Sequence, residues 1–199
     1  MENVVPTLVA RRLAERQEAY SSEIRALLEA ALVVMQRDDS IDPKVADIVR
    51  QAGLSNQAFY RHFDGKNALL LALLADGRER LAGTIERRMA RAGARDREAR
   101  IRAWIDAMLD QARDATASAA TRPFVANATR LAIEFPTEVA ASQEQLVEPL
   151  RAIVGADDAR AVYHLTMGVV HDAIAQRRSP TRHETDAVTE FSIRGCTHD

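Results

Sequence analysis

The sequence predicts an all-α fold of about nine helices, and three observations support that prediction. Ala, Leu, Arg and Glu, which favour helix, are abundant among the 199 residues. Only 8 Gly and 6 Pro occur, too few for the many turns of a β-sandwich. Apolar residues also recur at the three- and four-residue spacing of a helix face in segment after segment.

Composition is that of a soluble globular protein, with 47% hydrophobic and 28% charged residues. Cys196 is the only cysteine, so a disulfide within the chain is impossible and a reducing compartment is expected. The sequence shows no secretion signal and no run of the ~20 apolar residues that span a bilayer. We therefore expect a cytoplasmic protein.

The first element predicted is an N-terminal arm, residues 1–20. Pro6 interrupts its apolar run, so we expect a mobile arm that becomes helical near Leu8 or later. A helix with one apolar face is predicted from Ser22 until "RDDS" ends it. Its inward residues are Ile24, Leu27, Leu28, Ala31, Leu32 and Met35.

Two short helices joined by a tight turn come next. In the first, Asp42 is expected to cap the helix, Pro43 to take the first helical position and Gly53 to lie just past the end. Ser55 can cap the second helix, which runs to about Phe63. This spacing predicts a helix-turn-helix, whose second helix enters the major groove of DNA.

The rest of the chain predicts six longer helices. They cover residues 66–91, a segment containing 101–109, 123–135, a segment from 136, 157–177 and 181–193. Pro149 should kink or end the fourth of these, and Thr181 with Glu184 fits a capping box at the start of the last. Cys196 and His198 are expected in an exposed tail.

The stretch "LSNQAFYRHFDGK" (54–66) mixes aromatic and basic residues as a DNA-reading helix would. Phe59 and Phe63 lie four residues apart and should pack inward. Asn and Gln can pair with adenine and Arg with guanine, while a Tyr hydroxyl can donate to a phosphate. The candidates for these contacts are Asn56, Gln57, Tyr60 and Arg61, with Lys66 and Lys44 as phosphate clamps.

Across "VADIVRQAGLSNQAFYRHFDGKNALLLALL" (45–74) the sequence resembles the TetR-type transcriptional regulators. The similarity lies in the Ala-Gly-Leu-Ser turn, the following Tyr and aromatic residue, and the Lys that starts a Leu-rich helix. It implies that Ser55, Asn56, Gln57, Tyr60, His62 and Lys66 touch DNA. It also implies a DNA-binding domain at 21–66 and a ligand-binding and dimerisation domain at 67–199.

Two features depart from the family pattern. The family usually opens the first motif helix with Thr, whereas this chain has "DPK", so the phosphate contact would pass to Lys44. Residues 1–66 also carry nine Lys and Arg against ten Asp and Glu, a net charge of −1. Affinity would then depend on Arg11, Arg12 and Arg16 or on base contacts. A motif that is only scaffold is the alternative.

The helix at 157–177 is expected to be covered on two sides. Its small residues permit close helix approach: Ala159, Ala161, Gly168, Ala173 and Ala175. With Val188 and Phe191 of the last helix it could form a four-helix interface with a second copy. Such a homodimer would place two recognition helices about 34–36 Å apart on a palindromic operator. The alternative is a helix buried within one monomer.

A small-molecule pocket is expected among the middle helices, mostly apolar with a few polar groups. The ligand-binding candidates are Trp104, Met108, Phe124, Asn127, Phe135, Met167 and His171. Each of them is individually more typical of ordinary core than of a ligand wall. His164 and His171 are seven residues apart, which does not suit a zinc pair, so we expect no metal and no cofactor.

No catalytic signature is present, so we do not expect an enzyme. The predicted function is a sequence-specific DNA-binding transcriptional regulator that binds a palindromic operator as a homodimer. We expect a repressor released by a small apolar or amphipathic effector through a population shift. Two alternatives remain: a constitutive DNA-binding regulator without effector, and a helical small-molecule-binding scaffold protein without DNA binding.

Overall fold

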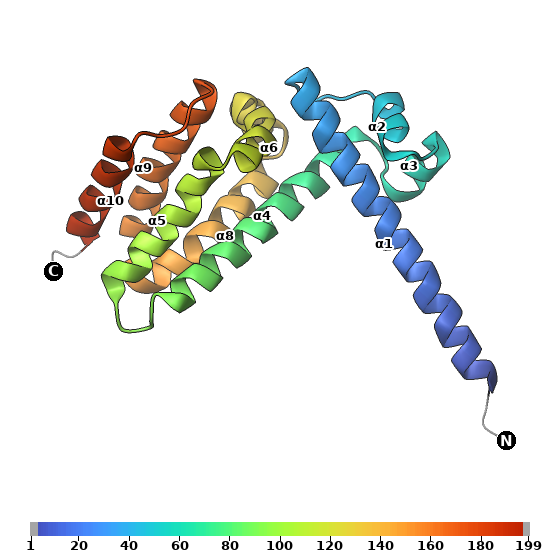
Figure 1. Cartoon of the computed structure of the whole chain (residues 1–199), viewed down its shortest axis with the longest axis horizontal. Coiled ribbons are helices and arrows are strands. Elements are labelled where there is room, and N and C mark those ends of the chain that lie inside the picture. Colours follow the sequence, from blue (N-terminus) through green and yellow to red (C-terminus); the bar gives the residue numbers. More distant parts are fainter. Residues whose placement is uncertain (1–3, 197–199) are drawn as a thin grey trace. The chain divides into compact units, whose positions relative to one another are not determined.

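The computed structural model describes residues 4–196, and the side chains from Arg12 onward. This part of the chain is all-α, as predicted, with ten helices (Figure 1). They are α1 (Val4–Asp38), α2 (Val45–Ala52), α3 (Asn56–His62), α4 (Lys66–Arg91), α5 (Arg97–Arg113), α6 (Ala115–Ala126), α7 (Ala128–Glu134), α8 (Pro136–Val154), α9 (Ala156–Ala175) and α10 (Arg182–Cys196). None of these described helices is long and apolar enough to cross a membrane.

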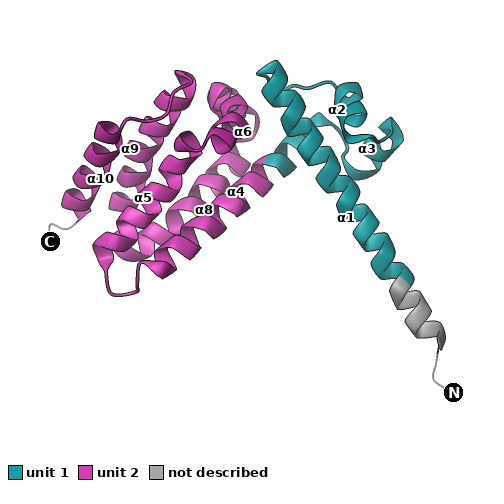
Figure 2. Ribbon diagram, viewed as in Figure 1, with its two compact units in different colours: residues 1–73 teal, residues 74–199 magenta. Residues whose placement is uncertain are grey.

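The chain forms two compact units, residues 1–73 and residues 74–199, coloured separately in Figure 2. The division falls inside α4, seven residues beyond the boundary expected from the sequence (73 against 66). The first unit therefore includes the opening turns of the Leu-rich helix, whose Leu69, Leu70 and Leu73 are buried.

In the first unit, α2 and α3 pack against the C-terminal half of α1. Leu27, Ala31, Ile48 and Phe59 are completely buried there. The expectation of a mobile arm over 1–20 is wrong for its described part, because α1 is one helix of 35 residues. Pro6 lies in its first turn, where a missing N–H breaks no hydrogen bond within the helix.

The turn between α2 and α3 has the predicted chemistry. Gly53 adopts φ +67°, and the Leu54 amide donates to the Val49 carbonyl at 2.9 Å, which closes the end of α2. The Ser55 hydroxyl accepts from the Ala58 amide at 3.1 Å and caps α3. These two caps set where α3 begins relative to α2.

The predicted start of α2 is wrong. The helix begins at Val45, so Pro43 is not its first residue, and the N-cap residue is Lys44, which makes no side-chain cap. Asp42 is not the cap because its carboxylate pairs with Lys66 at the start of α4. Asp42, which was expected to cap α2, thus connects the segment before α2 to the start of α4.

The core of the second unit lies where α5 packs against α6, α8, α9 and α10. Trp104 of α5 is completely buried, and its indole N–H donates to the Leu146 carbonyl of α8 at 2.9 Å. Its ring meets Tyr163 of α9 edge-on, with the ring centroids 6.5 Å apart. Ile101, Ile105, Met108 and Leu109 of the same helix are buried in this core as well.

Three expectations for the second unit need correction. The segment predicted as one helix over 123–135 is two helices, since α6 begins at Ala115 and ends where the Asn127 side chain donates to the Pro123 carbonyl. Pro149 lies inside α8, which continues to Val154, so of the two expected outcomes, a kink or an end, the end does not occur. Cys196 is buried at the end of α10 rather than exposed, while His198 lies outside the described residues.

Candidate DNA-binding site

The exposed side of α3 carries the polar residues that the sequence selected. Ala58 and Phe59 face the core, with 5% and 0% exposure, and this fixes the rotation of the helix. Asn56, Gln57 and Tyr60 consequently point to solvent, and Tyr60 is 60% exposed. A short helix anchored on one side and polar on the other is suited to enter a DNA groove.

Lys44 and Ser55 stand at the beginnings of the two motif helices. Lys44 is exposed at the N-cap of α2, where free backbone amides and the positive helix end favour a phosphate. Ser55 is exposed, but its hydroxyl already accepts from the Ala58 amide. Its hydroxyl proton remains available for a phosphate oxygen.

A cluster of four residues joins the C-terminal end of α3 to α1; we call it the Glu23 cluster. Its members are Tyr20, Glu23, Arg61 and His62. The Glu23 carboxylate bonds the His62 ring nitrogen Nε2 at 2.6 Å and also accepts from the Arg61 guanidinium. Tyr20 packs edge-on against the His62 ring, with centroids 4.4 Å apart and planes at 65°. These contacts lock α3 onto α1.

The same contacts determine the electrostatics of the cluster. The hydrogen bond from His62, followed by that from Arg61, holds the pKa of Glu23 below its ordinary value. Glu23 therefore remains ionised near neutral pH. Arg61 is consequently held by a carboxylate while its side chain stays half-exposed.

His62 does not fit the role that the resemblance implied. Its side chain is 0% exposed, enclosed by Tyr20 and Glu23, and cannot reach a phosphate without leaving that site. Its contacts with Tyr20 and Glu23 hold the end of α3 against α1. We therefore remove His62 from the candidate DNA contacts and keep the other seven.

Sequence reasoning missed Tyr20, Glu23 and Asp42 as parts of this site. Glu23 lies 39 residues before His62, and Asp42 lies 24 residues before Lys66. Nothing local in the sequence marks such distant partners. The clue that existed was the polar residue Glu23 on the helix face that carries Leu27 and Ala31.

Ion pairing leaves few free cations in the described part of the first unit. Glu23, Asp38, Asp42 and Asp47 each pair with a neighbouring Lys or Arg. The cations that form no ion pair within the described residues are Arg12, Arg16, Arg25 and Lys44. The basic part of the surface is therefore concentrated on α1 and the start of α2.

The ligand-binding candidates lie in the second unit at different depths. Trp104 and Met108 are fully buried in the core, and Phe135 is 8% exposed between α7 and α8. Phe124, Met167 and His171 are half-buried. Burial lowers the pKa of His171, so its ring favours the neutral form.

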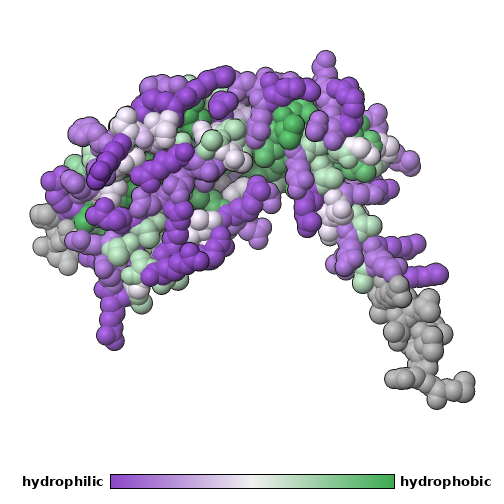
Figure 3. All heavy atoms as spheres, in the orientation of Figure 1, coloured by the Kyte–Doolittle hydropathy of each residue, from purple (hydrophilic) through white to green (hydrophobic). Residues whose placement is uncertain are grey.

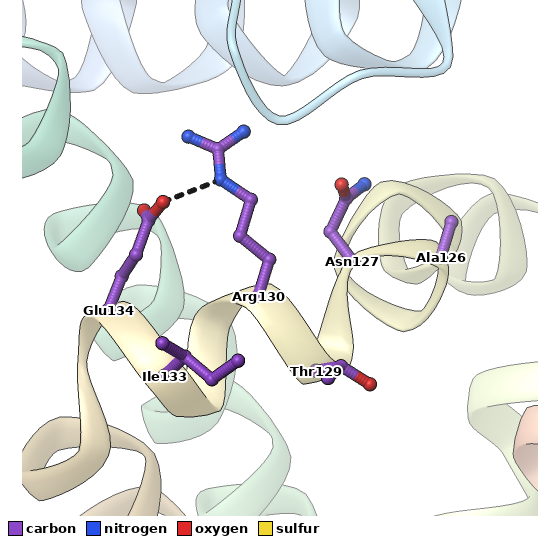
Figure 4. A pocket seen from close by; sticks show the side chains of 6 residues that line it. All are labelled: Ala126, Asn127, Thr129, Arg130, Ile133 and Glu134. Carbon is purple, nitrogen blue, oxygen red and sulfur yellow. Dashed lines mark hydrogen bonds and ion pairs between the residues drawn. The ribbon is translucent and has the colours of Figure 1, made fainter.

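Two hollows open on the surface of the second unit. One, of about 410 Å³, runs along α6 and α7 and is lined by Ala126, Asn127, Thr129, Arg130, Ile133 and Glu134 (Figure 4). Figure 4 shows Arg130 and Glu134 paired along one edge, with a contact of 2.8 Å. Asn127 is the single ligand-binding candidate in that lining. The other, of about 470 Å³, is lined by residues of α4, α5 and α8 and the loop after α4.

The caps of α2 and α3, the buried Phe59 and the exposed polar face of α3 define a helix-turn-helix motif, which is followed by a second helical unit. Residues 27–73 match the sequence model of the bacterial regulatory proteins of the tetR family. The match covers the helix-turn-helix and the start of α4, and over this segment the chain is similar to the TetR-type transcriptional regulators.

Solved structures share the fold along most of the chain. A transcriptional regulator from Streptomyces coelicolor A3(2) superposes with a TM-score of 0.72 at 19% identity, covering 88% of this chain and 99% of its own. A TetR-family regulator from Agrobacterium tumefaciens gives 0.64 at 20%, with 90% and 100% covered. The regulator FadR from Bacillus subtilis in complex with stearoyl-CoA gives 0.62 at 16%, with 86% and 98% covered. No curated protein matches the sequence.

Proposed function

We propose that this protein is a cytoplasmic repressor that binds a palindromic operator as a homodimer and is released by a small apolar or amphipathic effector. The observation that carries the proposal is the exposed face of α3. Asn56, Gln57 and Tyr60 point outward from a helix whose other side is anchored by Phe59. Asn and Gln are suited to base edges, and Tyr60 and Lys66 to phosphates.

The homodimer is supported by an unusual surface on α9 and α10, two helices that pack together. Leu165 of α9 is 42% exposed and Phe191 of α10 is 61% exposed. Ala161 and Gly168 share the Leu165 face, one turn away on either side, and both are exposed. Large apolar side chains among small ones form a surface that a second copy can cover closely.

The effector is supported by the composition of the second unit and by one similar structure. Phe124, Met167 and His171 are half-buried, and together they have the mixture of apolar side chains and one polar group that is typical of a small-molecule site. FadR from Bacillus subtilis has the same fold and was solved with stearoyl-CoA, an amphipathic molecule. Effector and DNA would favour different spacings of the two recognition helices, and each would then weaken the binding of the other equally.

The proposal is tested by selecting bound duplexes from a random DNA pool and measuring their affinity. We expect a near-palindromic consensus bound at nanomolar concentration. Tyr60→Ala and Lys66→Ala should each abolish that binding while retaining the helical circular dichroism spectrum. Arg182→Ala, which removes an exposed arginine of α10, should bind as the wild type does. Absence of any enriched sequence would refute the proposal in favour of a scaffold.

Dimerisation and release need separate measurements. Phe191→Glu and Leu165→Glu should shift the sedimentation coefficient to that of a monomer, whereas Ile133→Glu, at a 76% exposed site on α7, should not. Stearoyl-CoA, stearate and coenzyme A would each be added to the operator complex. Release by stearoyl-CoA with a raised melting temperature supports an amphipathic effector. No release and no shift with any of a wider panel of apolar molecules would support a constitutive regulator.

A further inference from the structure

Helix α1 extends well beyond the part that packs in the helix-turn-helix. Every side chain from Arg12 to Ser22 is exposed, and we call this segment the α1 extension. Figure 1 shows it as a straight rod that continues past α2 and α3, and Figure 3 shows mainly hydrophilic residues along its described part. Leu13 and Tyr20 are nevertheless 60% and 48% exposed. A helix that exposes two large apolar side chains suggests a binding surface for another molecule.

One face of the α1 extension is continuous with the side of α1 that contacts α3. Tyr20 packs on His62 at the end of α3, and this contact identifies the side of α1 that faces α3. At 3.6 residues per turn, Leu13, Arg16 and Arg12 all lie within roughly 80° of Tyr20 around the helix. These four residues form a continuous strip that begins at α3 and runs toward the N-terminus of α1.

The strip carries positive charge that nothing within the described residues neutralises. Arg12 and Arg16 form neither an ion pair nor a side-chain hydrogen bond there, unlike Arg37, Arg50 and Arg61. The acids of the extension, Glu15 and Glu18, lie roughly 140° or more from Tyr20. The net charge of the extension is zero, but Glu15 and Glu18 lie outside the strip, with Glu15 roughly 60° beyond Arg12 around the helix. A partner seated on the strip would meet positive charge.

We propose that the α1 extension is a second DNA-contacting element, which places Arg12 and Arg16 on backbone phosphates beside the groove that α3 enters. This inference rests on the proposed operator binding. The strip is continuous with the DNA-binding face through the Tyr20–His62 contact, and its charge complements phosphate. Leu13 and Tyr20 supply apolar contact with sugars, and the Tyr20 hydroxyl a further donor. The same strip of a second copy is a poorer occupant because two-fold pairing would oppose like charges.

The test measures DNA affinity against salt for Arg12→Ala and Arg16→Ala, with Arg25→Ala as the matched control. Arg25 is also exposed and unpaired on α1, but it lies roughly 140° from Tyr20. The probe is a 40-base-pair duplex that carries the consensus selected by the wild-type protein, and an unrelated duplex of equal length is measured beside it. Alanine favours helix, so α1 should persist in all three variants, as circular dichroism would verify.

We expect each of the two strip variants to lower the slope of log affinity against log salt by about 0.9 for each phosphate that the arginine no longer neutralises. Binding of both duplexes at 50 mM salt should weaken about tenfold, with an unchanged consensus, because phosphates carry no sequence information. Arg25→Ala should match the wild type. Strip variants that also match the wild type would overturn the inference and leave operator binding intact. A change in sedimentation instead of affinity would assign the strip to a second copy, which also overturns it. If the wild-type protein selects no duplex from the pool, the proposed operator binding is itself refuted, and this inference is refuted with it.

Discussion

His62→Ala is the substitution that best separates the structural role of this residue from a DNA contact. The ring is 0% exposed, bonds the Glu23 carboxylate at 2.6 Å and meets Tyr20 edge-on at 4.4 Å. The hydrogen bond to a charged partner contributes about 1.5 kcal/mol. The ring pair adds about 0.5 kcal/mol, because Tyr20 is half-exposed, and the void left by the ring costs on the order of 1 kcal/mol. We expect the first unit to lose about 3 kcal/mol of unfolding free energy.

The assay is native-state hydrogen exchange, read on peptides from each helix. A loss of about 3 kcal/mol should speed exchange in α1, α2 and α3 by about a hundredfold. The second unit provides an internal reference. The protein has a single tryptophan, Trp104, buried in that unit, so the urea midpoint of its fluorescence should change little.

Tyr60→Phe is the matched control, because it keeps the ring that contacts Phe59 edge-on at 5.2 Å and removes only the exposed hydroxyl. It should leave exchange unchanged and weaken operator binding. His62→Ala should have the opposite pattern, with its main effect on stability, as read by hydrogen exchange, and not on operator binding. If His62→Ala instead leaves exchange within about 0.5 kcal/mol of the wild type and weakens DNA binding, the imidazole is a DNA contact and the burial argument is refuted.

Three further predictions concern other parts of the fold. Gly53→Ala should lower the unfolding free energy of the first unit, measured by urea denaturation, by about 1 kcal/mol. The cause is backbone strain and not crowding, because Gly53 has φ +67° and an added Cβ would meet no other atom. Gly65→Ala should cost less. Trp104→Phe should lower the unfolding free energy of the second unit by about 2 kcal/mol, since it deletes the donor to the Leu146 carbonyl and part of a buried ring. Glu184 is held by Arg178 and Thr181, which lower its pKa from 4.5 to about 2. Its stabilisation is therefore complete above pH 4.5 and lost as pH falls toward 2, and Glu184→Gln should remove that part of the acid unfolding curve.

Local sequence signals predicted the helix-turn-helix well because its determinants are local. Gly53 and Ser55 act within a few residues of themselves, and each has the cap expected of it. The apolar pair Phe59 and Phe63 likewise identified the inner side of α3. The burial of His62 was not predicted because its neighbours in space come from α1. A histidine beside an arginine at a helix end gives no local sign of a buried carboxylate partner.

The second unit was harder to predict, for a different physical reason. Pro123 was expected to open a helix, since proline favours the first turn, but it lies near the end of α6. The alanine-rich segment before it supports helix without an apolar stripe, and periodicity therefore gave no signal. At Cys196, the short distance to the chain end suggested exposure, whereas α10 packs against α5 and α9 and buries the thiol.

The low net charge of the DNA-binding half is explained by where its charges are placed. Nine cations and ten acids in residues 1–66 would suggest a surface that repels DNA. Two of those cations, Arg61 and Lys66, are held by Glu23 and Asp42 beside the exposed face of α3. Exposed ion pairs contribute only about 0–1 kcal/mol, so a phosphate can replace either carboxylate at little cost. The pairs also keep both side chains next to the exposed face of α3. Under the proposed function these acids would position the two cations for DNA, and the formal charge would then understate the affinity of the surface.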